Sequence, residues 1–278
     1  MSIALLVGGS GADGDPDHRH LVGAFLERFG ARVTHVVTAA PPPQASLAER
    51  LRRGLRRGDY LERLRRARWH AGPGPHPDAL ERALEREAGQ AVPTRMPGAE
   101  RVFTVRSHDG PECAALLDAA APEVLVAFGT RAPHGHPIDR ARLCALNLHL
   151  GLWPWYRGDS ALFWPVHGDE PGRLGVTVHR LVAGEGGGVA ATARIDYRPG
   201  DTEADLHARA VAVGTEMVLD AVEAALAGRL RFHEPDLSLG REFRRRERTV
   251  AAERRTLARL DEWAYRAATH VGAHRTGP

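Results

Sequence analysis

Short apolar runs alternate with segments of helical apolar spacing along most of the chain, and this alternation constrains the fold more than any other feature. The run Ile3 to Val7 ends in a glycine pair, a helical pattern covers His20 to Phe29, and Val33 to Val37 is again apolar. Alternation of this kind predicts βαβ units, whose strands lie parallel with helices on the faces of the sheet. The sequence therefore predicts an α/β fold with a mostly parallel sheet.

The same pattern continues through the middle of the chain. Further strands are predicted at Val102 to Val105, Val124 to Phe128, Ala145 to Leu150, Leu174 to Leu181 and Val189 to Tyr197. Helices are predicted at Pro111 to Ala120, Ile138 to Leu143 and Thr202 to Leu226. Ligands of open α/β sheets bind beyond the carboxyl ends of the strands, so polar residues at those ends are the candidates for a site.

Two arginine-rich segments stand outside this alternation. Residues 45–90 carry leucines at helical spacing, with a second helix predicted at Asp78 to Glu87, and we interpret them as a helical insertion. Residues 241–259 are predicted to form a loop followed by a charged helix. We therefore expect a core at residues 1–200, interrupted by the insertion at residues 45–90, and a C-terminal helical extension at residues 201–278.

The basic residues exclude several enzyme classes. The chain contains no lysine, so all 38 basic residues are arginine, and a lysine Schiff base, a pyridoxal phosphate anchor and a P-loop lysine are excluded. Because 35 acidic residues leave a net charge of only +3, a dedicated nucleic-acid binder is disfavoured. The arginine runs alternate with acidic residues, as is typical of a solvated helix face.

The cysteines and the apolar segments indicate the cellular compartment of the protein. Cys113 and Cys144 are the only cysteines, they lie in apolar patterns without metal-binding spacing, and we expect buried reduced thiols. The N-terminal apolar run lacks a basic region before it and runs into a glycine-rich turn, so it predicts a core strand in place of a signal peptide. No apolar run approaches the ~20 residues of a membrane span. We expect a cytoplasmic protein without a membrane segment.

Three motifs lack the full pattern of known nucleotide-binding or metal-binding sites. Gly9 to Gly14 matches GxGxxG after a strand, but a proline follows closely and no acidic residue ends the second strand. A turn that helps to hold an anionic group of an acceptor and a plain loop both remain open. Asp13, Asp15, Asp17, His18 and His20 lack EF-hand spacing, and the pair His134 and His136 has no third ligand nearby. The sequence therefore predicts no metal.

The stretch NLHLGLWPWYRG, residues 147–158, combines polar and aromatic side chains at the end of a predicted strand. Asn147 and His149 alternate with leucines, so in an extended segment their side chains share one face. An amide and an imidazole at the carboxyl end of a parallel strand can bind and protonate a ligand, although a hydrogen-bonded pair that only caps the strand remains an alternative.

Several motifs together resemble one family. Asn147-x-His149, the loop Tyr156 to Gly158, the pair Phe163 and Trp164, and Gly175 to His179 before a glycine-rich turn are similar to the formyltransferases that use 10-formyltetrahydrofolate. The resemblance extends from about residue 101 to residue 227 and is weaker before that. It implies a Rossmann-like formyltransferase fold, here with a helical insertion and a C-terminal helical extension.

The resemblance implies a catalytic set. Formyl transfer to an amine passes through a tetrahedral intermediate, in which Asn147 is expected to donate to the formyl oxygen and His149 to donate or to shuttle a proton. The family also places an aspartate on a nearby loop, but without a gap that position is Gly186, and Glu185 precedes it. The longer side chain of Glu185 restores the reach, or the activity is altered or lost; both remain open.

The resemblance also implies how the donor binds. Phe128, Gly129 and Thr130 are expected to border the pterin of 10-formyltetrahydrofolate, the co-substrate. The loop that borders donor and acceptor is expected to include Leu152 and Trp153, with its turn fixed by Arg157. No metal is expected.

The acceptor and the activity leave alternatives. Members that formylate initiator transfer RNA carry a C-terminal β-barrel, and the residues after 228 are too few and too helical for one, so we expect a small-molecule amine such as an amino sugar or a specialised metabolite and no nucleic acid. A hydrolase that releases formate and a non-catalytic binding protein on the same fold remain open. The charged terminal helix and the helix from Thr202 offer surfaces for a homodimer, which the sequence does not decide.

Overall fold

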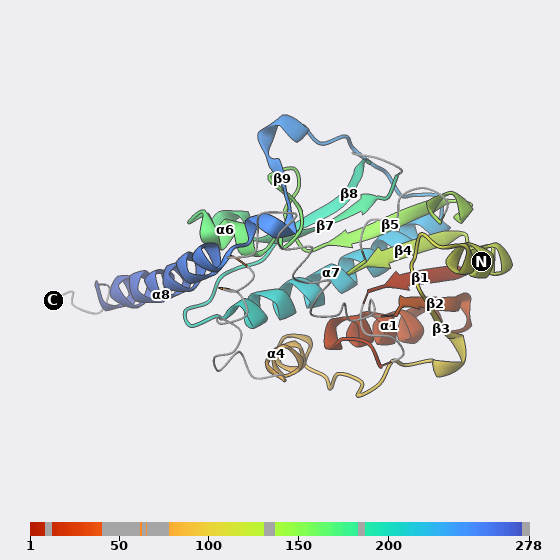
Figure 1. The fold of residues 1–278 in the computed structure, drawn as a ribbon, viewed down its shortest axis with the longest axis horizontal. Coiled ribbons are helices and arrows are strands. Elements are labelled where there is room, and N and C mark those ends of the chain that lie inside the picture. The colour runs from red at the N-terminus through yellow and green to blue at the C-terminus, as the bar shows by residue number, and fades with distance from the viewer. Residues whose placement is uncertain are drawn as a thin grey trace.

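The computed structural model describes residues 1–8, 13–40, 62, 65, 78–130, 137–182 and 187–273. Its centre is a seven-stranded sheet in the order β3-β2-β1-β4-β5-β7-β8, and a two-stranded sheet pairs β6 with β9 (Figure 1). The first five strands pair in parallel, whereas β7 is antiparallel to both β5 and β8. The α/β fold with a mostly parallel sheet is confirmed.

The elements alternate along the chain as predicted. The strands are β1 Ile3–Val7, β2 Val33–Ala39, β3 Val102–Val105, β4 Val124–Phe128, β5 Cys144–His149, β6 Tyr156–Gly158, β7 Gly175–Arg180, β8 Val189–Arg194 and β9 Arg241–Phe243. The helices are α1 Pro16–Phe29, α4 Ala79–Ala88, α5 Pro111–Ala120, α6 Phe163–His167, α7 Glu203–Leu226 and α8 Val250–Ala273. Short 3-10 helices lie at Gly30–Arg32, Ala99–Arg101, Ile138–Arg140, Pro171–Arg173, Leu237–Leu239 and Arg245–Glu247.

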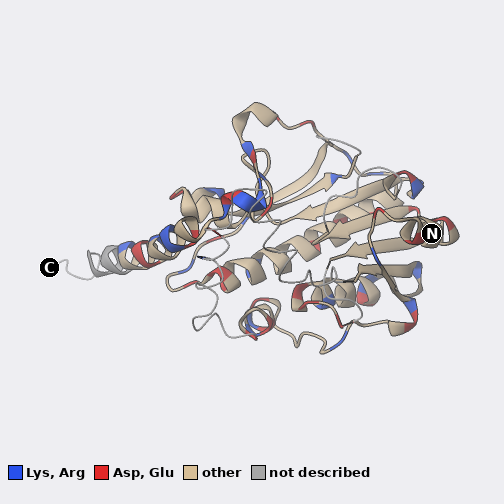
Figure 2. Ribbon diagram, in the orientation of Figure 1, with Lys and Arg blue, Asp and Glu red and all other residues tan. Residues whose placement is uncertain are grey.

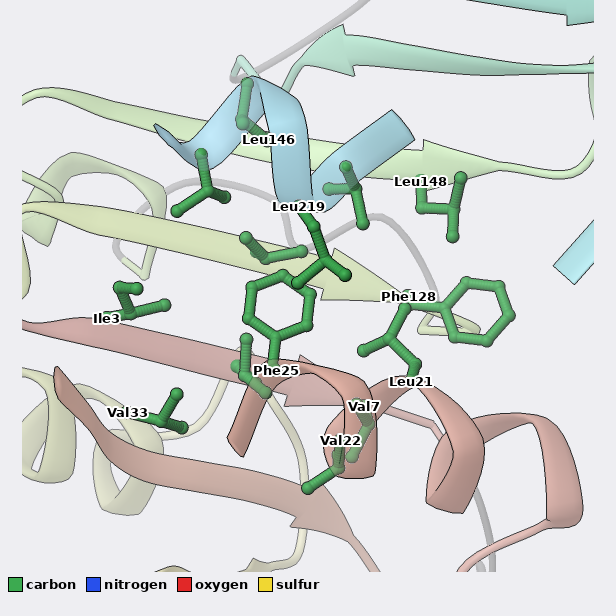
Figure 3. Packing of buried hydrophobic residues seen from close by; sticks show 14 of the residues in the cluster. Ile3, Val7, Leu21, Val22, Phe25, Val33, Phe128, Leu146, Leu148 and Leu219 are labelled. Carbon is green, nitrogen blue, oxygen red and sulfur yellow. The ribbon is translucent and has the colours of Figure 1, made fainter. Parts of the chain in front are cut away.

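Alternation along the strands builds a core on each face of the sheet. Leu5 of β1 packs with α1 and α7 on one face, whereas its neighbour Leu6 packs with α5 on the other. Figure 3 shows Phe25 of α1 and Leu219 of α7 meeting over the sheet. Because strands covered on both faces must be apolar throughout, all five residues of β1 and of β4 are buried.

Local sequence sets where the two long helices next to the site begin. Pro16 occupies the first turn of α1, where its missing N–H costs nothing, so Asp17 lies at the positive end of the helix. Thr202 caps α7: its side chain accepts from the backbone of Asp205, whose carboxylate accepts from the Thr202 backbone at 2.9 Å. The N-terminal turns of the two helices lie together, because His207 Nε2 of α7 donates to Asp17 Oδ2 of α1.

The structure corrects two predicted segments. The helix predicted at Ile138 to Leu143 is only a 3-10 turn over Ile138–Arg140, because the backbone is already extended at Ala141. Residues 241–243, predicted as a loop, form β9 because they pair with β6. Most of the predicted insertion lies outside the described residues, apart from the confirmed helix α4, and the division at residue 200 stays a prediction.

The cysteines and the charged residues follow the composition. Cys113 is buried, Cys144 is half-buried and neither forms a disulfide. Figure 2 shows acidic and basic residues interspersed along α8, which points away from the sheet (Figure 1). In the part of the chain that the structure describes, no helix is both long enough and apolar enough to span a bilayer.

Candidate active site

Asn147 and His149 lie at the carboxyl end of β5. The leucines between and before them, Leu146 and Leu148, pack into the core under α1 and α7. Strand alternation therefore turns the two polar side chains to the opposite face of the strand, as the sequence predicts. Phe128, the last residue of β4, is in register with Leu148, so the ends of the two strands meet at one edge.

A histidine on the neighbouring strand fixes the amide of Asn147. His179 is the cross-strand partner of Asn147, and its Nδ1 donates to the carbonyl of Arg180 at 3.0 Å. In a neutral ring the other nitrogen then accepts, so Asn147 Nδ2 donates to His179 Nε2 at 3.0 Å. Burial and the nearby His149 lower the pKa of His179 to about 4, which keeps this ring neutral at pH 7. One N–H of Asn147 is thus held, and the other can donate to a ligand.

His149 is held in one tautomer. Its Nε2 lies 3.1 Å from the carbonyl oxygen of Tyr156, and a carbonyl only accepts, so Nε2 carries the proton. Burial lowers the pKa of His149, and the bond to Tyr156 offsets only part of this effect. In the neutral ring the Nδ1 lone pair is basic. Among the described residues no carboxylate hydrogen-bonds to His149.

The two side chains open into a cavity of ≈ 400 Å³. Its walls come from the ends of β4 and β5, the loop after β6, helix α6, the first turn of α1, the first two turns of α7, and α8 with the segment before it. The volume lies in the range of small-molecule sites, roughly 300–1,000 Å³. The polar groups in the lining are Asp17, Thr130, Asn147, His149, Asp159, Ser160, Glu203, His207, Arg248 and Thr256.

The curated proteins that the chain resembles in sequence include several methionyl-tRNA formyltransferases. No protein-family model matches the chain. A methionyl-tRNA formyltransferase of Aromatoleum aromaticum is 31% identical over 124 residues, or 44% of this chain and 39% of the relative. One from Burkholderia thailandensis is 33% identical over 126 residues, or 43% of this chain and 38% of the relative. The chain thus matches less than half the length of these curated relatives.

Solved structures extend the likeness to the whole fold. A likely sugar N-formyltransferase of Mycobacterium tuberculosis has a TM-score of 0.54 at 16% identity, covering 89% of this chain and 77% of that one. Glycinamide ribonucleotide transformylase 1 of Symbiobacterium toebii has a TM-score of 0.51 at 20% identity, covering 84% and 91%. The chain is similar in sequence to part of the curated formyltransferases and has the fold of the solved ones. Its Rossmann-like architecture is thereby confirmed.

The residues expected at the donor fall into two groups in this formyltransferase fold. Phe128, Gly129 and Thr130 line the cavity. Leu152 and Trp153 lie outside its lining, and Trp153 stacks on His179 with ring centroids 4.1 Å apart. Arg157 donates to the carbonyls of Pro154 and Leu237, at 2.9 and 3.0 Å, and so fastens its loop as expected. The roles of all six in donor binding stay predictions.

The remaining sequence motifs are only partly described. Glu185, residues 9–12 and the pair His134 and His136 lie outside the described residues. Ligand atoms of Asp15, Asp17 and His18 lie within 4.8 Å of one another. Both oxygens of Asp17 already accept hydrogen bonds, from the His18 backbone at 2.9 Å and from His207 at 3.0 Å.

Sequence reasoning missed the far wall of the cavity. Asp17 and His207 meet there although 190 positions separate them, and no spacing rule connects such residues. Arg248 makes a two-pronged ion pair with Glu203, at 2.7 and 2.9 Å, and lies over the ring of Phe163. The apolar pattern at Thr202 to Leu226 predicts helix α7, but it does not predict which residues of this helix face a ligand.

Proposed function

We propose that this protein is an N-formyltransferase that moves a formyl group from 10-formyltetrahydrofolate to a primary amine of a small molecule. The placement of Asn147 and His149 in one cavity, on a chain related to formyltransferases, carries the proposal. The cavity also fits a polar co-substrate, because the buried Thr130 Oγ1 at its edge has no hydrogen-bond partner among the described residues.

Asn147, His149 and His179 have different roles in the proposed reaction. When the amine attacks the formyl carbon, negative charge develops on the formyl oxygen, and the N–H of Asn147 that does not bond to His179 donates to it. The neutral His149 accepts a proton from the attacking nitrogen at Nδ1 and returns it to the folate nitrogen as the old carbon–nitrogen bond breaks. His179 keeps the Asn147 amide oriented throughout. Glu185 remains the predicted third member.

An amino sugar is the acceptor that we favour. An N-formyltransferase of Helicobacter canadensis, solved with folinic acid and dTDP-3-aminofucose, has the same fold at a TM-score of 0.53 and 12% identity. It covers 89% of this chain, and 72% of its own length is matched. We propose a comparable small-molecule amine for this chain, with a cytoplasmic location and no nucleic acid partner.

The test is incubation with 10-formyltetrahydrofolate and a panel of amines that includes dTDP-3-aminofucose and glycinamide ribonucleotide. We expect amine-dependent release of tetrahydrofolate, followed by absorbance, and a product heavier by one formyl group by mass spectrometry. Formate released at the same rate without any amine would show a hydrolase instead. Binding of 5-formyltetrahydrofolate without turnover of any amine would show a binding protein.

A further inference from the structure

The cavity holds a second pair of acid–base residues opposite the Asn147 strand. Asp17 comes from the first turn of α1 and His207 from the second turn of α7, and both line the cavity that Asn147 and His149 line. The side chain of His207 is 34% exposed, whereas that of Asp17 is 11% exposed. The imidazole is therefore the member that a ligand reaches first, with the carboxylate behind it.

The hydrogen bonds of the pair fix its protons. Burial alone would raise the pKa of Asp17, but the hydrogen bond from His207 and the nearby His18 lower this pKa to about 2, so the carboxylate is charged. A carboxylate only accepts, so the bond of 3.0 Å places a proton on His207 Nε2. In the neutral ring His207 Nδ1 then has a lone pair, and no described residue hydrogen-bonds to it.

Formylation of an amine leaves a proton without an acceptor in the proposed reaction. A primary amine is mostly an ammonium ion at pH 7, since such groups have a pKa of roughly 8 to 10. The ammonium nitrogen must lose two protons to become an amide nitrogen. His149 passes one of them to the folate nitrogen, so a second base must take the other before attack.

We propose that the Asp17–His207 pair binds the acceptor as its ammonium ion and that His207 Nδ1 takes the first proton. This inference rests on the proposed function. The free amine then forms the new carbon–nitrogen bond, its second proton moves through His149 to the folate nitrogen, and the old carbon–nitrogen bond breaks. The first proton leaves from His207 to solvent, which balances the reaction.

The charges of the lining define the class of acceptor. Asp17, Asp159 and Glu203 bring carboxylates to the described walls, and the arginine there, Arg248, already pairs with Glu203. Such a lining attracts a cation and disfavours a phosphate at this place. The group that enters the cavity is therefore a cationic amine, with any phosphate of the acceptor lying outside these walls.

The test compares His207→Gln and Asp17→Asn with the wild type. Glutamine at position 207 retains an N–H donor for Asp17 but offers no basic nitrogen, so the carboxylate keeps a partner. We expect kcat/KM for dTDP-3-aminofucose, or for the panel amine that the wild type formylates fastest, to fall about 100-fold at pH 7 in either variant. The affinity for 5-formyltetrahydrofolate should stay within about twofold, because the pair is assigned to the acceptor.

The pH profile separates this role from a structural one. Around the pair lie His18 and His20 on α1, Glu203 on the same helix α7 and Arg248 ahead of α8. In His207→Gln only the free amine reacts, so kcat/KM should rise roughly tenfold per pH unit up to the pKa of the amine, whereas the wild-type profile is flatter. Glu216→Gln, an exposed residue of α7 outside the lining, is the matched control and should match the wild type.

Two results would overturn the inference in different ways. Variant activity within about twofold of an active wild type, or a loss that high pH does not recover, would remove the pair from the reaction. A wild type that transfers formyl to no amine would refute the proposed function and this inference with it.

Discussion

Replacement of His179 by glutamine tests whether the imidazole that bonds to Asn147 is buried and neutral. Burial and His149 lower the pKa of His179 from 6.5 to about 4, and the bond to the Arg180 carbonyl offsets only part of this. Between these two values the unfolded chain binds more protons than the folded one. The contribution of His179 to stability is therefore complete above pH 6.5 and is lost as the pH falls toward 4.

The magnitude follows from the two pKa values. A change of one pKa unit corresponds to about 1.4 kcal/mol, so the fall from 6.5 to about 4 corresponds to about 3 kcal/mol of unfolding free energy. Because His179 is only 6% exposed, solvent screening reduces this value little. Glutamine can still accept from Asn147 but cannot titrate, so the variant should lack this pH-dependent part.

The assay is urea unfolding of both proteins at several pH values between 4 and 7. The difference in unfolding free energy between wild type and His179→Gln should change by about 3 kcal/mol across this range, since histidines that do not interact with His179 contribute to both proteins alike. At pH 7 the variant should also lose about 1 kcal/mol, because its bond to the Arg180 carbonyl is gone. A difference that stays constant with pH would refute the neutral, buried state of His179.

Three further outcomes are expected. Asn147→Ala and His149→Ala should each abolish detectable formyl transfer while far-UV circular dichroism and 5-formyltetrahydrofolate binding persist. Glu185→Gln should cut kcat by at least about tenfold, and near wild-type turnover would remove this residue from the mechanism. Gly8→Ala should lower the unfolding free energy by about 1–3 kcal/mol in urea, because the new Cβ would lie 2.1 Å from the Gly129 oxygen, whereas Gly172→Ala, with no atom within 4 Å, should not.

The fold was predictable because its signals are local. Strands buried on both faces need continuous apolar runs, and the predicted bounds of β1, β4 and α5 agree with the structure to the residue. Strand β9 was not predicted because two of its three residues, Arg241 to Phe243, are charged. Its extended conformation depends on pairing with β6. Pairing between segments so far apart leaves no trace in local periodicity.

The candidate site also contains residues that local sequence predicts and residues that depend on the tertiary structure. Asn147 and His149 stand two residues apart on one strand, so alternation alone places them on one face. His179 was visible only as part of a family motif, and its role depends on the antiparallel register that sets it opposite Asn147. Asp17 comes from the first turn of α1 and His207 from the second turn of α7, and only the packed fold brings them together.

The hydrogen-bond partners of the histidines near the end of the sheet explain why these side chains can have different roles in one reaction. His149 and His179 face backbone carbonyls that fix their tautomers, and burial keeps both rings neutral. His207 instead donates from Nε2 to the charged carboxylate of Asp17. Transfer of a formyl group to an ammonium ion requires two bases. One is a neutral group that carries a proton near the formyl group, and the other binds the cationic amine. If both proposals hold, the donor lies beside Asn147 and His149, and the acceptor amine beside Asp17 and His207.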